Sequence, residues 1–221
     1  MVRHIAGLPT DRNLNVTMKT IVRIWRVFCD RRPAALRPLK KSDYERDLLR
    51  DPDKAKAAFE KAWAIRNFEI EMYWKRATYF WAFIASTFVG YFGLTSSSNY
   101  QRPDVFDHSE VYVVICVGFL LSLAWLLTNI GSKSWQRHWE VHVDLLEDQF
   151  TGPLYKTTYP RKTFFVSKIN EIVSAVITTV WLMLGIKFLF DQSLIHFPGK
   201  PDWMIGAATV GTLLAVCAMI A

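Results

Sequence analysis

Apolar residues gather into four long blocks along the chain. The blocks cover residues 77–94, 111–130, 172–190 and 204–221; the second and fourth contain no charged residue and the third contains only Lys187. A transmembrane helix needs about 20 predominantly apolar residues. A soluble protein can bury one such helix, but four in 221 residues leave too little polar surface to cover them. The pattern predicts an all-α, polytopic integral membrane protein with four transmembrane helices.

The first two blocks are predicted to be the membrane ends of longer helices. Asp51-Pro52 is typical of an N-cap followed by proline at the first helical position, and neither Pro nor Gly follows until Gly90. The second helix is predicted to continue to Asp148, before the stop signal Gly152-Pro153. We therefore expect a long-helix hairpin within residues 51–155, whose first two helices extend beyond the membrane as an antiparallel two-helix stalk.

Apolar residues at helical spacing indicate how the stalk helices face each other. They are Phe59, Trp63, Ile70 and Trp74 on the first helix, and Trp135, Trp139, Val143 and Leu146 on the second. If Arg76 and Lys133 lie at the same depth, the register predicts ion pairs of Arg66 with Asp144, and of Glu69 or Glu71 with Arg137.

The hairpin separates two other regions. Residues 1–50 form an N-terminal region with a predicted basic amphipathic helix at 16–29, and residues 156–221 contain the second transmembrane pair, 172–190 and 204–221, which we expect to begin near Ser167. The helix at 16–29 has Lys19, Arg23 and Arg26 on one face and Ile21, Ile24, Trp25 and Phe28 on the other. It is either a membrane-surface anchor or a segment that docks on the stalk or on a neighbouring subunit.

Charge sets the expected orientation. Residues 1–76 hold 18 of the 27 Lys and Arg and residues 131–168 hold six, whereas the other two loops hold one each. Cytoplasmic loops carry the excess of Lys and Arg, so both the N-terminus and the C-terminus are expected to be cytoplasmic. The pI of about 9.4 could indicate nucleic-acid binding. Because the basic residues flank the apolar blocks, a lipid bilayer is the expected partner, with no nucleic acid.

Candidate chemical sites are few. His138 and His142 have a spacing that can chelate a metal, with Glu140 and Asp144 nearby, but the order is H-x-E-x-H and no third ligand is evident. A polar stalk surface is the favoured interpretation, and we expect no metal, cofactor or catalytic residue. The sequence contains no phosphate loop or nucleophile elbow. The three cysteines show no disulfide framework.

Lys187 is the one charged residue inside an apolar block. Intramembrane charges are functional candidates by default. Its position near the outer end of the span favours snorkelling to the headgroups, while a pore-lining or subunit-pairing role stays open.

Two stretches around the first two spans are distinctive: R-N-F-E-I-E-M-Y-W-K-R-A-T-Y-F-W-A-F at 66–83, and G-S-K-S-W-Q-R-H-W-E-V-H-V-D-L-L-E at 131–147, followed by G-P-L-Y at 152–155. They resemble the bacterial RipA family of octameric membrane proteins, in which a small polar residue is expected where His138 stands. The layout is also loosely similar to two-span effector modules of bacterial conflict systems. The signature residues of the stalk and interface are Arg66, Glu69, Glu71, Tyr73, Trp74, Arg76, Trp135, Arg137, Trp139, Glu140, His142, Asp144 and Glu147.

The resemblance implies a homo-oligomer of eight subunits in the bacterial inner membrane. The expected function is a non-enzymatic scaffold or pore-like assembly with a cytoplasmic helical stalk, and the sequence points to no known small-molecule substrate. The alternative is an ion channel or small-solute transporter with a pore between subunits. An enzyme is least favoured, because no paired catalytic groups are evident.

Overall fold

The computed structural model describes residues 41–220 except 99, 101–107, 158–165 and 196–202. All regular structure in these residues is helical, which confirms the all-α prediction. A short helix α2 (Lys41–Tyr44) runs into a single π-helical turn η1 (Glu45–Leu49). Four long helices follow: α3 (Pro52–Thr95), α4 (Ser109–Glu147), α5 (Val166–Ile195) and α6 (Trp203–Ile220). The predicted helix at 16–29 lies outside the described residues.

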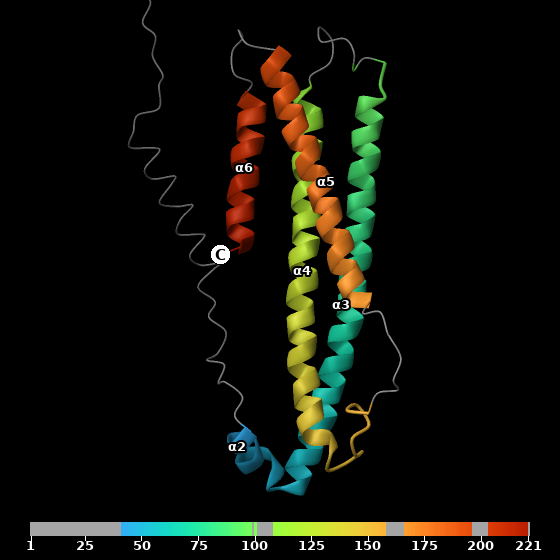
Figure 1. The fold of residues 1–221 in the computed structure, drawn as a ribbon, viewed down its shortest axis with the longest axis vertical. Coiled ribbons are helices and arrows are strands. Elements are labelled where there is room, and N and C mark those ends of the chain that lie inside the picture. Colours follow the sequence, from blue (N-terminus) through green and yellow to red (C-terminus); the bar gives the residue numbers. More distant parts are fainter. Residues whose placement is uncertain (1–40, 99, 101–107, 158–165, 196–202, 221) are drawn as a thin grey trace, which may run out of the picture.

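Helices α3 and α4 form the long antiparallel hairpin expected from the sequence (Figure 1). The side chain of Asp51 caps α3 by accepting hydrogen bonds from the amides of Asp53 and Lys54, at 3.1 and 3.2 Å, and Pro52 occupies the first turn. At 44 residues, α3 is about 65 Å long, roughly twice the thickness of a bilayer core. In Figure 1, α5 and α6 cover only one end of the hairpin. We call residues 52–76 of α3 and 131–147 of α4, most of which lie beyond α5 and α6, the stalk.

Each of the four long helices contains a segment long and apolar enough to cross a membrane. The predicted spans at 77–94, 111–130 and 172–190 fall inside α3, α4 and α5, and the fourth agrees with α6 to within one residue at each end. Helix α5 begins at Val166, one residue before the expected start. The four-span architecture is therefore confirmed.

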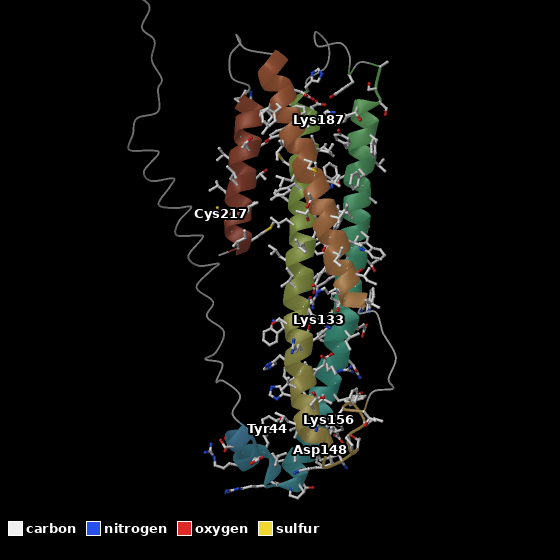
Figure 2. The ribbon with its side chains drawn as sticks, in the orientation of Figure 1. Tyr44, Lys133, Asp148, Lys156, Lys187 and Cys217 are labelled. Carbon is white, nitrogen blue, oxygen red and sulfur yellow. The ribbon has the colours of Figure 1, made fainter. Side chains whose placement is uncertain are left out.

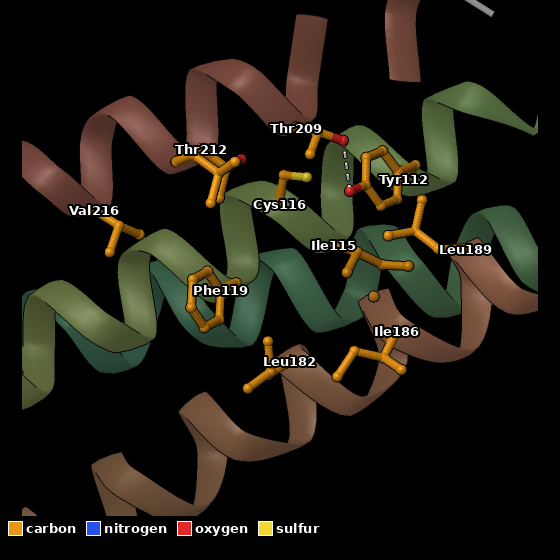
Figure 3. A pocket seen from close by; sticks show the side chains of 12 residues that line it. Tyr112, Ile115, Cys116, Phe119, Leu182, Ile186, Leu189, Thr209, Thr212 and Val216 are labelled. Carbon is orange, nitrogen blue, oxygen red and sulfur yellow. Dashed lines mark hydrogen bonds between the residues drawn. The ribbon is translucent and has the colours of Figure 1, made fainter. Parts of the chain in front are cut away.

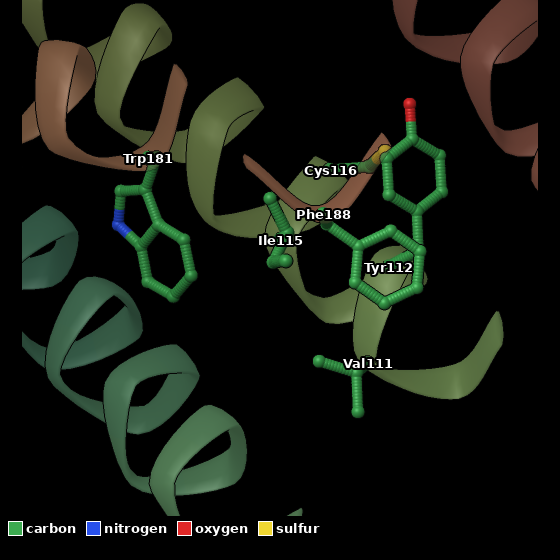
Figure 4. Packing of buried hydrophobic residues seen from close by; sticks show 6 residues of the cluster. All are labelled: Val111, Tyr112, Ile115, Cys116, Trp181 and Phe188. Atoms are coloured by element: carbon green, nitrogen blue, oxygen red, sulfur yellow. The ribbon is translucent and has the colours of Figure 1, made fainter. Parts of the chain in front are cut away.

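Helix α4 is the central helix of the membrane part, in contact with α3, α5 and α6. Figure 4 shows the main cluster of buried residues: Val111, Tyr112, Ile115, Cys116, Trp181 and Phe188. Trp181 of α5 is completely buried, and its indole lies over Gly118 of α4. A side chain at position 118 would collide with this ring, since a Cβ placed there lies 2.4 Å from Trp181 Cε2. Small residues of this kind let membrane helices approach closely.

In the stalk, the inward face of α3 is narrower than predicted. Its buried positions are Ala55, Ala62 and Tyr73, where two small residues allow α4 to come close. The aromatic side chains of Phe59 and Trp63 lie about 40–60° and about 80–100° around the helix from these positions, and both are only partly buried.

Two of the eight predicted stalk contacts are therefore wrong. Trp74 is 44% exposed and Trp135 is 47% exposed, because both flank the contact instead of forming it. Val143 and Leu146, by contrast, are 1% exposed and pack with Ala62 and Tyr44, as the helical spacing predicts for the second helix.

Candidate functional site

The stalk ends in a tight turn that closes on the last residue of α4. The main-chain carbonyl of Glu147 accepts hydrogen bonds from the amides of Phe150, Thr151 and Gly152, at 3.0, 2.9 and 3.1 Å. Gly152 has a φ of +69°, a left-handed conformation that a residue without Cβ adopts readily. The Gly-Pro stop therefore does more than end the helix, because it directs the following residues back along the stalk.

The carboxylate of Glu147 holds the returning segment in place. Glu147 is 0% exposed, and its Oε2 accepts a hydrogen bond from the Tyr155 amide at 2.9 Å. Lys156 Nζ lies 3.9 Å from Oε1 and donates to Asp148 at 2.7 Å, a hydrogen bond that raises the pKa of Lys156. Figure 2 shows Lys156 and Asp148 together at the end of the stalk, far from Lys133. A buried carboxylate is costly unless paired, so this arrangement makes the turn specific.

The ring of Tyr155 packs against α3. It meets Trp63 edge-on with centroids 5.0 Å apart, and the Arg66 guanidinium lies 5.1 Å from the Tyr155 centroid. The predicted ion pair of Arg66 with Asp144 is therefore wrong. The guanidinium instead lies over aromatic rings, which attract a cation through their negative faces. Arg66 and Asp144 lie at similar depth along the stalk, but their side chains point in different directions around the helix axes.

On the side of α4 opposite to the returning segment, the short helix α2 docks through an aromatic contact. The Tyr44 hydroxyl lies 3.2 Å from His142 Nδ1, and the two rings are 5.6 Å apart. Burial raises the pKa of Tyr44 to about 12. Burial, together with the neighbouring His138, lowers the pKa of His142. Both shifts favour the neutral forms that share this hydrogen bond.

The two histidines do not form a metal centre with a third described residue. His138 and His142 have ring centroids 4.7 Å apart, but no group of three His, Cys, Asp or Glu side chains suitable for a metal occurs among the residues that the structure describes. His138 lies edge-on to both Trp135 and Trp139. The pair is thus part of a column of rings along α4.

A layer of polar side chains crosses the molecule where the stalk meets the membrane part. Arg76 of α3 donates to Ser132 Oγ of α4 at 2.7 Å and lies 3.4 Å from Glu69 Oε2. The contact with Ser132 confirms that Arg76 and residue 133 lie at nearly the same depth. The predicted pairing of Glu69 or Glu71 with Arg137 is wrong, because each glutamate pairs along its own helix: Glu69 with Arg76, and Glu71 with Lys75 at 2.7 Å.

The same layer joins α5 to the hairpin. Asn170 Nδ2 donates to the Tyr73 hydroxyl at 2.9 Å, so that α5 is linked to α3. Asn129 Nδ2 donates to Ser174 Oγ at 3.2 Å and lies 3.4 Å from the carbonyl of Asn170, which links α5 to α4. All four side chains are buried. Hydrogen bonds between helices are one of the forces that hold membrane helices together.

Near the other end of the membrane part, α4, α5 and α6 surround a cavity of about 240 Å³ (Figure 3). Its lining is apolar except for Cys116, two threonines and Tyr112, whose hydroxyl is hydrogen-bonded to Thr209 of α6 at 2.9 Å. Lys187 is exposed on α5 towards this same end, as Figure 2 shows. Lys187 thus lies near the end of its span away from the stalk, where its side chain can extend to the lipid headgroups or pair with another subunit.

Several predicted signature residues face away from the contact between the two helices. Glu71, Trp74, Trp135 and Arg137 are exposed. Trp139, Glu140 and Asp144 are partly buried. The structure thus brings the side chains of Arg66, Tyr73, Arg76, His142 and Glu147 into contact with other elements of the fold. The exposed residues lie on the outer surface of the hairpin.

The residues that sequence reasoning missed are mostly polar groups inside apolar runs. Asn129 and Ser174 carried a usable signal, since an amide or hydroxyl at membrane depth needs a partner, whereas Asn170 lies just before its apolar block. Tyr44 and Lys156 carried none, because their contacts depend on how the chain turns at the two ends of the stalk.

The chain was compared with known proteins. A family model described as the octameric membrane protein family (8xMP) matches residues 56–190, more than half of the chain. The matched region contains the stalk except residues 52–55, the turn at 148–155, the polar layer and Lys187. The match confirms the expected resemblance to a family of octameric membrane proteins and does not bear on the name RipA. No curated protein and no solved structure matches the chain.

Proposed function

We propose that this chain, which belongs to the octameric membrane protein family, forms a homo-oligomeric scaffold of eight subunits in the bacterial inner membrane. The family name indicates octameric self-association. The stalk extends into the cytoplasm, and both chain ends lie on that side. The asymmetry of Lys and Arg between the loops supports this orientation.

One observation carries the scaffold assignment: three hydrogen bonds join polar side chains of different helices, within the spans and where the stalk meets them. Tyr73 is bonded to Asn170, Asn129 to Ser174, and Tyr112 to Thr209 of the last helix. Tyr112 and Thr209 line the cavity between α4, α5 and α6, but their hydroxyls are bonded to each other and most of the remaining lining is apolar, which does not suit a water-filled route. The spans instead present apolar side chains outwards, which suits lipid and neighbouring subunits.

We propose no catalytic activity for the assembly. Among the described residues, Glu147 is the one buried carboxylate, and its Oε2 is occupied by a main-chain amide. His138 lies edge-on to two tryptophans, and His138 and His142 have no third ligand in the described part of the chain. These groups support a structural role for the signature residues.

The test is the size, symmetry and conductance of the purified protein in lipid nanodiscs. The expected result is a particle of eight subunits by mass photometry, eightfold symmetry by electron microscopy, and no current after reconstitution into planar bilayers. A stable monomer or dimer would refute the scaffold. For orientation, a reporter fused after residue 221 is expected to be active only on the cytoplasmic side, and periplasmic activity would overturn the topology.

The alternative function is a channel or small-solute transporter with a pore between subunits. The exposure of Lys187 favours it, because a cation on the outer surface of α5 can line an axis once subunits surround it. A steady conductance whose anion preference falls in Lys187→Gln, but not in Lys168→Gln, would establish the channel. Lys168 is a matched control, since it is also exposed on α5 but lies at the other end of that helix.

A further inference from the structure

The end of the stalk carries an aromatic cavity that lies too far from the membrane for lipid to fill. The cavity has a volume of about 320 Å³ and is lined by Phe59, Glu60, Trp63, Thr151, Leu154 and Tyr155. Phe59 is 18 residues before the first span, which places it about 27 Å beyond the membrane surface at roughly 1.5 Å per residue. The surrounding solvent at that distance is water.

Apolar side chains remain open to that water. Leu154 is 65% exposed and Phe150 is 37% exposed. Phe59 and Trp63 have ring centroids 6.2 Å apart, and the ring of Phe150 stacks on Phe59 at 5.7 Å. The apolar surface is therefore continuous across α3 and the turn. In the spans, lipid covers exposed apolar residues, but a contiguous patch in water indicates a protein contact.

We propose that this cavity is the docking site of the chain's own N-terminal segment 16–29, from the same or a neighbouring subunit. The segment has an apolar stripe of Ile21, Ile24, Trp25 and Phe28 at helical spacing, as an aromatic groove requires of a helical partner. It lies only a short way before α2, which packs on the end of the stalk beside Val143 and Leu146.

Chain length permits the contact. Phe28 precedes Lys41, the first residue of α2, by 13 residues, and an extended chain of that length spans up to about 45 Å. An α-helix with its side chains is roughly 10–12 Å across, so this length is enough to pass around two helices to the cavity side. The same length also reaches a neighbouring subunit packed against the stalk.

The surroundings of the cavity include the carboxylate of Glu60 and the guanidinium of Arg66, which lies over the rings of Trp63 and Tyr155. Segment 16–29 contains Lys19, Arg23 and Arg26 and no acidic residue. Glu60 on the rim of the cavity is exposed and has no ion-pair partner among the described residues. A docked helix that buries its apolar stripe in the cavity leaves its basic face beside this carboxylate.

Hydrogen exchange of residues 16–29 in the full-length protein, in lipid nanodiscs, tests the proposal. Leu154→Asp and Trp25→Asp are each expected to speed exchange of this segment by about tenfold or more, because each places a charge in the apolar contact. Phe68→Asp is the matched control: Phe68 is 55% exposed on α3 but lies outside the cavity, and exchange should stay within about twofold of the wild type.

Lipid composition separates this docking from a membrane-surface anchor. In nanodiscs of phosphatidylcholine alone, the segment is expected to be as protected as in nanodiscs containing phosphatidylglycerol. Protection that requires phosphatidylglycerol and is unchanged by Leu154→Asp would overturn the proposal, as would an unprotected segment in the wild type or equal loss with Phe68→Asp.

A crosslink locates the contact directly. A photoreactive phenylalanine analogue at position 25 is expected to capture residues 59–63 or 150–155, and mixing isotopically heavy and light subunits shows whether the contact lies within or between chains. Capture only of lipid, or of other protein regions, would contradict the docking. The proposal does not depend on the scaffold function, since particle size and conductance are separate measurements.

Discussion

A single methyl group at position 118 tests the packing that holds α4 and α5 together. In Gly118→Ala, the added Cβ lies 2.4, 2.6 and 2.7 Å from Trp181 Cε2, Cδ2 and Cζ2, all far below a normal contact. These atoms belong to a rigid indole that cannot fold away. The ring is also confined on its other side, because Phe88 stacks on it at 4.5 Å and Tyr91 meets it edge-on at 5.8 Å.

The expected cost follows from this geometry. Extra methylene groups in a well-packed core typically destabilise by about 1–3 kcal/mol, and this site lies at the high end because neither the helix backbone nor the ring can move alone. Replacing a helical glycine by alanine returns about 0.5–1 kcal/mol of helix propensity. The net loss of unfolding free energy is therefore expected to be about 2 kcal/mol.

The assay is reversible unfolding in mixed detergent micelles, followed by circular dichroism. Gly131→Ala is the control on the same helix, since nothing lies within 4 Å of its added Cβ, and its stability should change by less than about 0.5 kcal/mol. Trp181→Leu should relieve the collision, so that the double variant is more stable than the sum of the single changes predicts by at least about 1 kcal/mol. An unchanged stability of Gly118→Ala, or strict additivity, would refute the packing argument.

Three other predictions use the same unfolding assay or hydrogen exchange. Glu147→Ala should destabilise by about 2–4 kcal/mol and expose residues 150–157 to exchange, whereas Glu147→Gln keeps the acceptor and should cost less than half as much. Tyr73→Phe should cost about 1 kcal/mol, because it leaves the buried Asn170 amide without its acceptor, and it should have no effect in an Asn170→Ala background. Folding lowers the pKa of His142, so below the ordinary value of 6.5 the unfolded protein binds more protons than the folded protein. The protection of residues 41–49 from hydrogen exchange should therefore fall as pH drops below about 6.5 and stay constant above it. The same fall in His142→Phe would contradict this.

The helix boundaries were predictable because local chemistry determines them. Asp51 and Pro52 begin α3 wherever the rest of the chain lies, and the length of each apolar run sets how much of a helix crosses the membrane. The depth at which Arg76 meets α4 was also predictable, since antiparallel helices with a common rise keep their register over the whole stalk.

Side-chain pairing was less predictable because it depends on rotation about the helix axis. Ala62 and Tyr73, not the neighbouring tryptophans, face α4, and this rotation moves Arg66 away from Asp144 and onto the ring of Tyr155. Sequence periodicity favoured the larger aromatic side chains, which in fact flank a contact made close by alanine.

Both parts of the molecule bury apolar residues, and the surrounding solvent explains why further kinds of contact are added in the membrane part. At the end of the stalk, water supplies a hydrophobic driving force, and the packed residues are Ala62, Val143 and Leu146. In the membrane part, lipid is as apolar as leucine, so helices gain little from burying apolar groups against one another. There, α4 meets its neighbours through the apolar cluster around Trp181, through a glycine under that indole, and through hydrogen bonds such as that of Asn129. A polar substitution should therefore be most damaging in the stalk core, and a bulky apolar one most damaging at the contact of α4 with α5.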